Sequence, residues 1–96
     1  MQVEELSTGL VLVDFYSQGC GPCKMMVPIL EQLGEDNLDV SIVALDVASD
    51  LELAQKYQVR TVPTFVLLGN GVLLNKKVGA CSKQVLQEFI NNNKGK

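Results

Sequence analysis

Runs of hydrophobic residues alternate along the chain with stretches in which hydrophobic and polar residues repeat every three or four positions. The runs fall at Leu10 to Tyr16, Asp39 to Val47, Thr64 to Leu68 and Val72 to Val78. Short runs of this length predict β-strands, and the near-continuous apolar run Leu10 to Tyr16 predicts the buried centre of a sheet. We therefore expect four strands.

Helical spacing follows the first and last of these runs. A stripe at i, i+3, i+4 and i+7 predicts a helix over Cys23 to Leu33, with Pro28 inside it. Ser82 is placed to cap a final helix, and its apolar face is Val85, Leu86, Phe89 and Ile90. Both stripes are typical of packing against a hydrophobic core.

Two shorter helices complete the predicted set. Ser49 to Glu52 matches a capping box, which predicts a short helix ending at Tyr57. Met1 to Thr8 is mixed in character and is interpreted as a stub of helix.

The order of the elements indicates the fold class. Strand, helix and strand in succession predict a parallel pair, and Gly69-Asn70-Gly71 predicts the turn of an antiparallel hairpin. The chain is thus expected to be α/β, with a mixed four-stranded sheet (βαβ, then a β-hairpin) flanked by helices. Its 96 residues fit a single domain, 1–96.

Cys20 and Cys23 lie where the first strand gives way to a helix. With Cys20 at the N-cap, Gly21 and Pro22 fall in the first turn, where a proline is tolerated. Pro22 has no N–H, so the amide of Cys23 is the donor available to the Cys20 sulfur. The helix dipole favours negative charge there, so a Cys20 thiolate is favoured over the thiol.

This spacing favours a redox pair. Side chains three residues apart on a helix lie on one face, close enough for a disulfide that forms and is readily reduced. Cys20 would attack a substrate disulfide, and Cys23 would resolve the mixed disulfide. A structural disulfide is one alternative; a zinc site is another, but the chain has three cysteines and no histidine.

Asp14 interrupts the first apolar run. A buried carboxylate acquires a raised pKa and makes a useful acid–base group, which is the favoured interpretation. The alternative is that Asp14 lies at an exposed strand end.

Pro63 precedes the third strand, and the sequence by itself does not decide whether the Val62–Pro63 bond is cis.

The net charge of the chain indicates which classes of partner it is unsuited to bind. A net charge of −3 and a pI near 4.7 argue against nucleic acid and against an anionic membrane surface. The start of the chain has no basic segment, and the apolar runs are too short to span a bilayer. We expect a cytoplasmic protein.

Cys81 is interpreted as a small buried hydrophobe, with a regulatory thiol as the alternative.

Several motifs in order resemble the thioredoxin family over nearly the whole chain. They are Val13-Asp14-Phe15, Cys20-Gly-Pro-Cys-Lys24, Pro28, Ala54-Gln-Lys-Tyr57, Thr61-Val-Pro-Thr-Phe65, Asn70-Gly71 and Val78-Gly-Ala80. The resemblance implies a thioredoxin-like fold in which Pro63 is cis and faces the cysteines, with Asp14 behind Cys23. It also implies a substrate-binding surface made of Gly19, Gly21, Pro22, Val62, Pro63 and Gly79.

The same resemblance implies a protein-disulfide reductase that works through a Cys20–Cys23 dithiol/disulfide cycle. Electrons would come from a flavoprotein thioredoxin reductase, with no cofactor or metal bound to the chain itself. The expected partners are that reductase and disulfide-containing target proteins, and the chain is expected to be a monomer. A disulfide oxidase or isomerase of the same fold, and a redox-silent binding module, are the alternatives.

The chain departs from the family pattern in three places. It has no room for the usual first strand, so the strand over Asp39 to Val47 is expected at an edge of the sheet. Gly19 and Tyr16 stand where tryptophans are usual, and Ala44 stands where a lysine often neighbours the buried aspartate.

Overall fold

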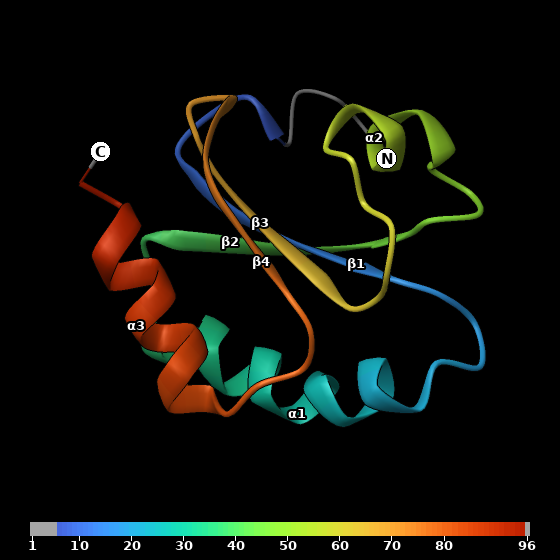
Figure 1. Ribbon diagram of the computed structural model, residues 1–96. Helices are drawn as coiled ribbons and strands as arrows, with labels where there is room; N and C mark the ends of the chain where they lie inside the picture. Colours follow the sequence, from blue (N-terminus) through green and yellow to red (C-terminus); the bar gives the residue numbers. More distant parts are fainter. Residues whose placement is uncertain (1–5, 96) are drawn as a thin grey trace.

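The computed structural model describes residues 6–95, which form one sheet with helices on both faces (Figure 1). The strands lie in the order β2-β1-β3-β4. Along the chain the elements are β1 (Leu10–Tyr16), α1 (Gly21–Asp36), β2 (Val40–Asp46), α2 (Leu51–Lys56), β3 (Thr64–Gly69), β4 (Val72–Val78) and α3 (Lys83–Asn93).

The sheet has the predicted mixed topology. β1 and β2 are parallel, with Leu10 opposite Val40, whereas β1 with β3 and β3 with β4 are antiparallel. The α/β class with a βαβ unit and a hairpin is confirmed. Over residues 6–95, β2 lies at one edge, as expected, and β4 lies at the other.

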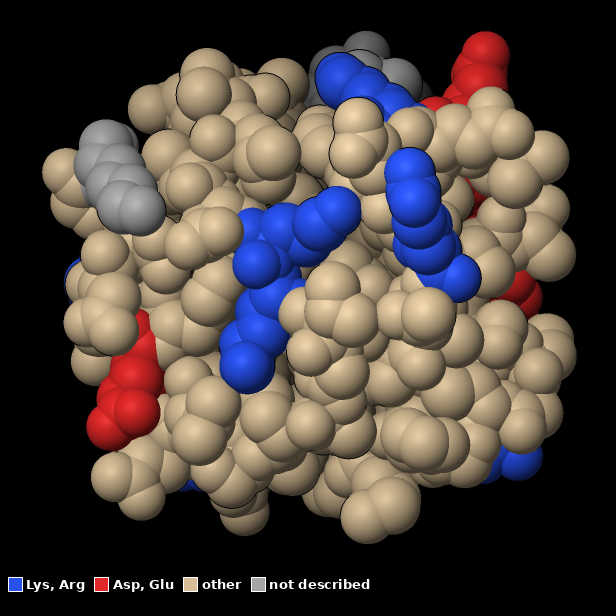
Figure 2. All heavy atoms as spheres, in the orientation of Figure 1, with Lys and Arg blue, Asp and Glu red and all other residues tan. Residues whose placement is uncertain are grey.

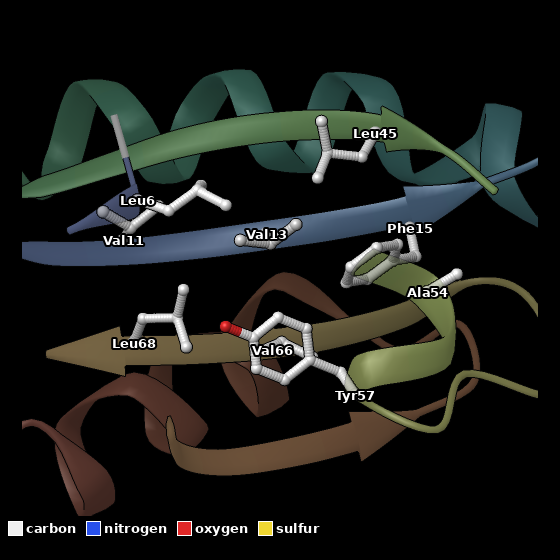
Figure 3. Close-up of a cluster of buried hydrophobic side chains, with 9 residues drawn as sticks. All are labelled: Leu6, Val11, Val13, Phe15, Leu45, Ala54, Tyr57, Val66 and Leu68. Carbon is white, nitrogen blue, oxygen red and sulfur yellow. The ribbon is translucent and has the colours of Figure 1, made fainter. Parts of the chain in front are cut away.

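The two faces of β1 and β3 bury separate hydrophobic clusters. α1 and α3 cover one face, where Leu12 and Phe65 meet Met26, Leu33, Leu86 and Ile90. Figure 3 shows the other face, where α2 contributes Ala54 and the chain just after it contributes Tyr57. There the nine buried side chains are Leu6, Val11, Val13, Phe15, Leu45, Ala54, Tyr57, Val66 and Leu68. Burial on both faces explains why β1 and β3 are almost uninterrupted apolar runs.

Helix ends differ from the expectation in two places. α1 begins at Gly21 and continues to Asp36, beyond the predicted Cys23 to Leu33. The capping box predicted at Ser49 to Glu52 is wrong: α2 has Asp50 at its N-cap, and no side chain caps it. Of the helix stub predicted over Met1 to Thr8, residues 1–5 lie outside the described range, and Leu6 is buried in the core.

Two local signals in the second half are confirmed. Asn70 and Gly71 both have positive φ, of 50° and 84°, as a two-residue hairpin turn requires. The Asn70 side chain also accepts a hydrogen bond from the Gly9 amide at 2.8 Å, which joins the turn to the start of β1. Ser82 caps α3, where its Oγ accepts from the Val85 amide at 3.2 Å.

β4 holds the segment between α2 and β3 in place. Lys76 Nζ donates to the carbonyl oxygens of Tyr57 and Gln58, each at 3.2 Å. At the end of β4 the Gly79 amide donates to the Pro63 carbonyl at 2.8 Å. The segment that carries Pro63 is therefore hydrogen-bonded to the hairpin at both of its ends.

The surface does not carry a continuous basic patch in the view that Figure 2 gives. Lysine and arginine side chains form small groups that are set apart from one another by uncharged surface, and acidic ones lie toward the margins of this face. No helix within residues 6–95 is long and apolar enough to cross a membrane.

Ser82→Ala is expected to lower the free energy of unfolding by about 1 kcal/mol, because the Val85 amide loses its capping acceptor. Urea denaturation of the two proteins measures the difference. Ser82→Asp, which retains a capping oxygen, is the matched control and should stay close to wild type. An equal loss in both variants would contradict the capping role.

Candidate active site

Cys20 and Cys23 form a disulfide at the start of α1, with their Cα atoms 5.3 Å apart. Cys20 is the N-cap residue, with extended backbone (φ −78°, ψ 108°). Its Sγ accepts a hydrogen bond from the Cys23 amide at 3.1 Å. The capping geometry expected from Gly21-Pro22 is confirmed: the sulfur of Cys20 lies where the helix dipole and a free N–H favour negative charge.

The two cysteines differ in their access to solvent. Cys20 is partly exposed, whereas Cys23 is only 4% exposed. Gly21 and Pro22, between them, are both exposed. Cys20 is therefore more accessible to a large disulfide-bearing partner than Cys23 is.

The segment before β3 lies directly beside Cys20. The Cys20 Sγ lies 4.0 Å from the Val62 carbonyl oxygen. The Val62–Pro63 peptide bond is cis, as the resemblance implied, and Pro63 is buried. Through its amide, Gly79 contacts the Pro63 carbonyl. Residues far apart in sequence thus bring backbone groups together around one sulfur.

Asp14 lies within β1 rather than at its exposed end. The residue is 4% exposed, and its Oδ1 is buried without a hydrogen-bond partner. Its strand neighbours are Ala44 on β2 and Phe65 on β3, which provide no charge or donor from their side chains. Burial raises the pKa of Asp14 from the ordinary value of 3.8 to about 6.

A cavity of about 230 Å³ joins Asp14 to Cys23, since both residues line it. Gly19 and Ser17 also line this cavity, so it reaches the loop before Cys20. A volume of this size has room for water beside the carboxyl and the inner cysteine. The structure therefore brings together the acid–base candidate and the inner cysteine.

The sequence reasoning missed Val27, which lines the same cavity. Val27 is half exposed on α1 and falls four residues after Cys23. Residues four apart lie on one helix face, so this spacing was the signal that could have identified it.

Gly19 adopts a left-handed conformation, with φ +78°. A Cβ built there would contact nothing within 4 Å, so the space beside Cys20 is open. Glycine is favoured at this position because it tolerates a positive φ, and its missing side chain leaves Cys20 more accessible.

Cys81 lies apart from the disulfide as a free, partly exposed thiol that packs against the cluster under α1 and α3. Burial raises the pKa of the Cys81 thiol, and the charge of Lys77 opposes that rise. The prediction of a small buried residue is therefore wrong as to burial, because Cys81 packs against this cluster but remains partly exposed. Within the described range, 6–95, no three Cys, His, Asp or Glu side chains converge on a possible metal position.

Comparisons with known proteins agree with this geometry. The model of the Thioredoxin family matches residues 1–92. Thioredoxin from Bacillus subtilis (strain 168) is 43% identical over 88 residues, which are 91% of this chain and 85% of that protein. Thioredoxin from Mycoplasmoides gallisepticum is 36% identical over 80 residues, which are 83% and 80% of the two chains.

Solved structures give the same result. A mutant thioredoxin from Halobacterium salinarum superposes with a TM-score of 0.85 at 36% identity, covering 94% of this chain and 79% of that one. Oxidised mitochondrial thioredoxin 3 from Saccharomyces cerevisiae gives a TM-score of 0.86 at 36% identity, covering 93% and 84%.

Asp14→Asn is expected to remove a pH dependence of stability. The native state holds the Asp14 proton more tightly than the unfolded state, so wild-type stability falls as pH rises from about 4 toward 7, by about 3 kcal/mol, and then levels off. The amide does not titrate, so the variant lacks this fall. Urea denaturation of both proteins across this pH range measures the slope.

Glu35→Gln is the matched control for that measurement, because it makes the same carboxylate-to-amide change at an exposed position of α1. It should retain the wild-type slope. Parallel pH profiles for Asp14→Asn and wild type would show that the Asp14 carboxylate is not buried at a cost.

Gly19→Ala is expected to destabilise the protein by about 1 kcal/mol, because a Cβ is disfavoured at φ +78° even where space is open. Gly21→Ala provides the control, since that residue lies in the first turn of α1, with ordinary φ and open space. Thermal or urea denaturation of oxidised proteins should separate the two. Equal stabilities would indicate that Gly19 is not held in this conformation.

Proposed function

Because the chain belongs to the thioredoxin family, we propose that Cys20 is its attacking sulfur and Cys23 its resolving sulfur. The chain is a thiol-disulfide oxidoreductase that reduces protein disulfides. One observation carries the division of roles: Cys20 is partly exposed and its Sγ accepts a hydrogen bond from the Cys23 amide, whereas Cys23 is buried.

The reaction begins on reduced protein with the Cys20 thiolate. It attacks one sulfur of a target disulfide, so that a Cys20–target disulfide forms and the first target cysteine leaves as a thiolate. Cys23 then loses its proton, and its thiolate attacks Cys20 Sγ. The Cys20–Cys23 disulfide forms, the second target cysteine leaves as a thiolate, and both target thiolates take up protons. Two electrons have passed to the target.

Asp14 is proposed as the base for the second step. A carboxylate with a pKa near 6 is charged at neutral pH, yet its affinity for a proton is higher than that of an exposed aspartate. It shares a cavity with Cys23, so water can link the two groups. Asp14 would accept the Cys23 proton as the buried sulfur becomes nucleophilic.

The target is proposed to bind across Gly19, Gly21, Pro22, Val62, Pro63 and Gly79. The contact between Cys20 Sγ and the Val62 carbonyl, and the hydrogen bond between Gly79 and Pro63, support this surface. It offers mainly backbone groups and small residues, which suits an extended target segment that contains a cysteine.

The electron donor is proposed to be a flavoprotein thioredoxin reductase, and the targets disulfide-containing proteins. We further propose that residues 1–96 act as one domain, as a monomer in the cytoplasm, without a bound cofactor. One sheet with both core clusters on its faces supports the single domain. The negative net charge of −3 gives no support to nucleic acid or an anionic membrane as partner.

Cys20→Ser is expected to abolish reduction of insulin, whereas Cys23→Ser should still attack and then stall. Mass spectrometry of Cys23→Ser after mixing with insulin should show a covalent adduct through Cys20. The physical reason is that only the partly exposed sulfur is accessible to the target.

Cys81→Ser is the control, because it removes a thiol outside the pair and should retain activity. Adducts that form equally well in Cys20→Ser would reverse the assignment. Wild-type protein that is inactive with a strong dithiol donor would instead favour a redox-silent binding module.

A further inference from the structure

Asp14 also lines a second cavity, of about 410 Å³. Asp14, Val27 and Ala44 line both cavities, so the two adjoin at these residues. The second cavity continues between α1 and β2, where Glu31, Gly34 and Ile42 line it. Together they make a groove that runs from the loop at Gly19, past the buried carboxylate, to the far part of α1.

Small side chains keep this groove open. Ala44 lies directly opposite Asp14 in the β1–β2 register, and it is exposed. At the outer end Gly34 has no side chain, and a Cβ built there would lie 3.7 Å from Ile42 Cδ1. Because β2 is an edge strand of the sheet over residues 6–95, no further described strand covers the groove.

The outer end lies away from the surface proposed for targets. Glu31 is 11 residues beyond Cys20 in sequence, which places it roughly 16 Å further along the helix axis. The first cavity includes Gly19, which a bound target would cover. None of the residues that line the second cavity belongs to the proposed target surface. A bound target would therefore leave this end in contact with solvent.

We propose that the groove between α1 and β2 is a water passage through which Asp14 exchanges its proton with solvent while a target occupies Cys20. This rests on the proposed role of Asp14 as the base for Cys23. The passage begins at the Asp14 carboxyl, because this 4% exposed residue lines both cavities. Its Oδ1 is buried without a hydrogen-bond partner, so no protein group competes with water for the carboxyl at that atom.

The proton balance of the step is then complete. Cys23 S–H transfers its proton through water to the Asp14 carboxylate, and the Cys23 thiolate attacks Cys20 Sγ as described above. The proton on Asp14 then passes to water in the second cavity and to bulk solvent at Glu31. The titratable side chains that line the two cavities beside Asp14 are Tyr16 from β1 and Cys23, Lys24 and Glu31 from α1.

Ala44→Leu tests the passage, because a larger side chain at this exposed position fills the groove where the two cavities meet. Reduced protein is mixed with excess insulin and quenched with acid at short times, and mass spectrometry follows the mixed disulfide. We expect its resolution to slow about tenfold, within the range that general acid–base catalysis contributes. Formation of the mixed disulfide should stay within about twofold of wild type, since that step uses only Cys20.

The pH profile separates a blocked passage from a shifted pKa. Added burial raises the pKa of Asp14 further, which moves the midpoint of the resolution rate to higher pH. A blocked passage also lowers the plateau above that midpoint. Ser41→Leu is the matched control: it adds the same side chain to an exposed position of β2, on the strand face opposite to Ala44. It should leave both midpoint and plateau unchanged.

A second variant narrows the outer end of the groove and adds a smaller side chain than Ala44→Leu does. Gly34→Ala adds one methyl group in ordinary contact with Ile42, and alanine is favoured over glycine within a helix. It should fold and lower the plateau by a smaller factor than Ala44→Leu. A wild-type plateau in both Ala44→Leu and Gly34→Ala would overturn the passage.

Asp14→Asn in the same assay separates this inference from the proposed function. Slow resolution in Asp14→Asn, together with wild-type plateaus in the two groove variants, would reject the passage and retain Asp14 as the base. Wild-type resolution in Asp14→Asn would reject Asp14 as the base, and the passage with it.

Discussion

The hydrogen bond from the Cys23 amide to the sulfur of Cys20 is the contact on which the site depends. It can form only if α1 begins directly after Cys20. Pro22 favours that start because a proline in the first turn loses no helical hydrogen bond. Its missing N–H also leaves the Cys23 amide as the donor to the sulfur. The same contact fixes which sulfur faces outward. The greater accessibility of Cys20 and the electrostatic preference for negative charge on its sulfur therefore both follow from one helix terminus.

Near that helix terminus the fold buries the Asp14 carboxyl, which lowers the stability of the native state. Asp14 is buried between Ala44 and Phe65 with one oxygen unpartnered, which opposes folding at neutral pH. The remainder of β1 offsets this, since Val11, Leu12, Val13 and Phe15 are all fully buried. A strand packed on both faces can retain one ionisable residue for chemistry, because its neighbours supply the stability.

Local signals in the sequence predicted local structure well. β1 and β4 have the predicted bounds, and Ser82 and Cys20 cap their helices as expected. The capping box failed because the preceding turn forms through Asp46, whose carbonyl accepts from Ser49 and whose side chain accepts from Ala48. Features made by distant segments could not be predicted from residue types alone. The approach of Val62 to Cys20 and the groove beside Ala44 both depend on how whole elements pack.

The Lys76 hydrogen bonds have a consequence for slow fluctuations of the native state. Lys76 joins β4 to the chain after α2, and the Gly79 amide joins the end of β4 to Pro63. Detachment of the hairpin edge must therefore break contacts at both ends of the intervening segment. Amide hydrogens of β4 and of the 57–63 segment should then become deuterated together, as one cooperative opening unit, instead of fraying independently.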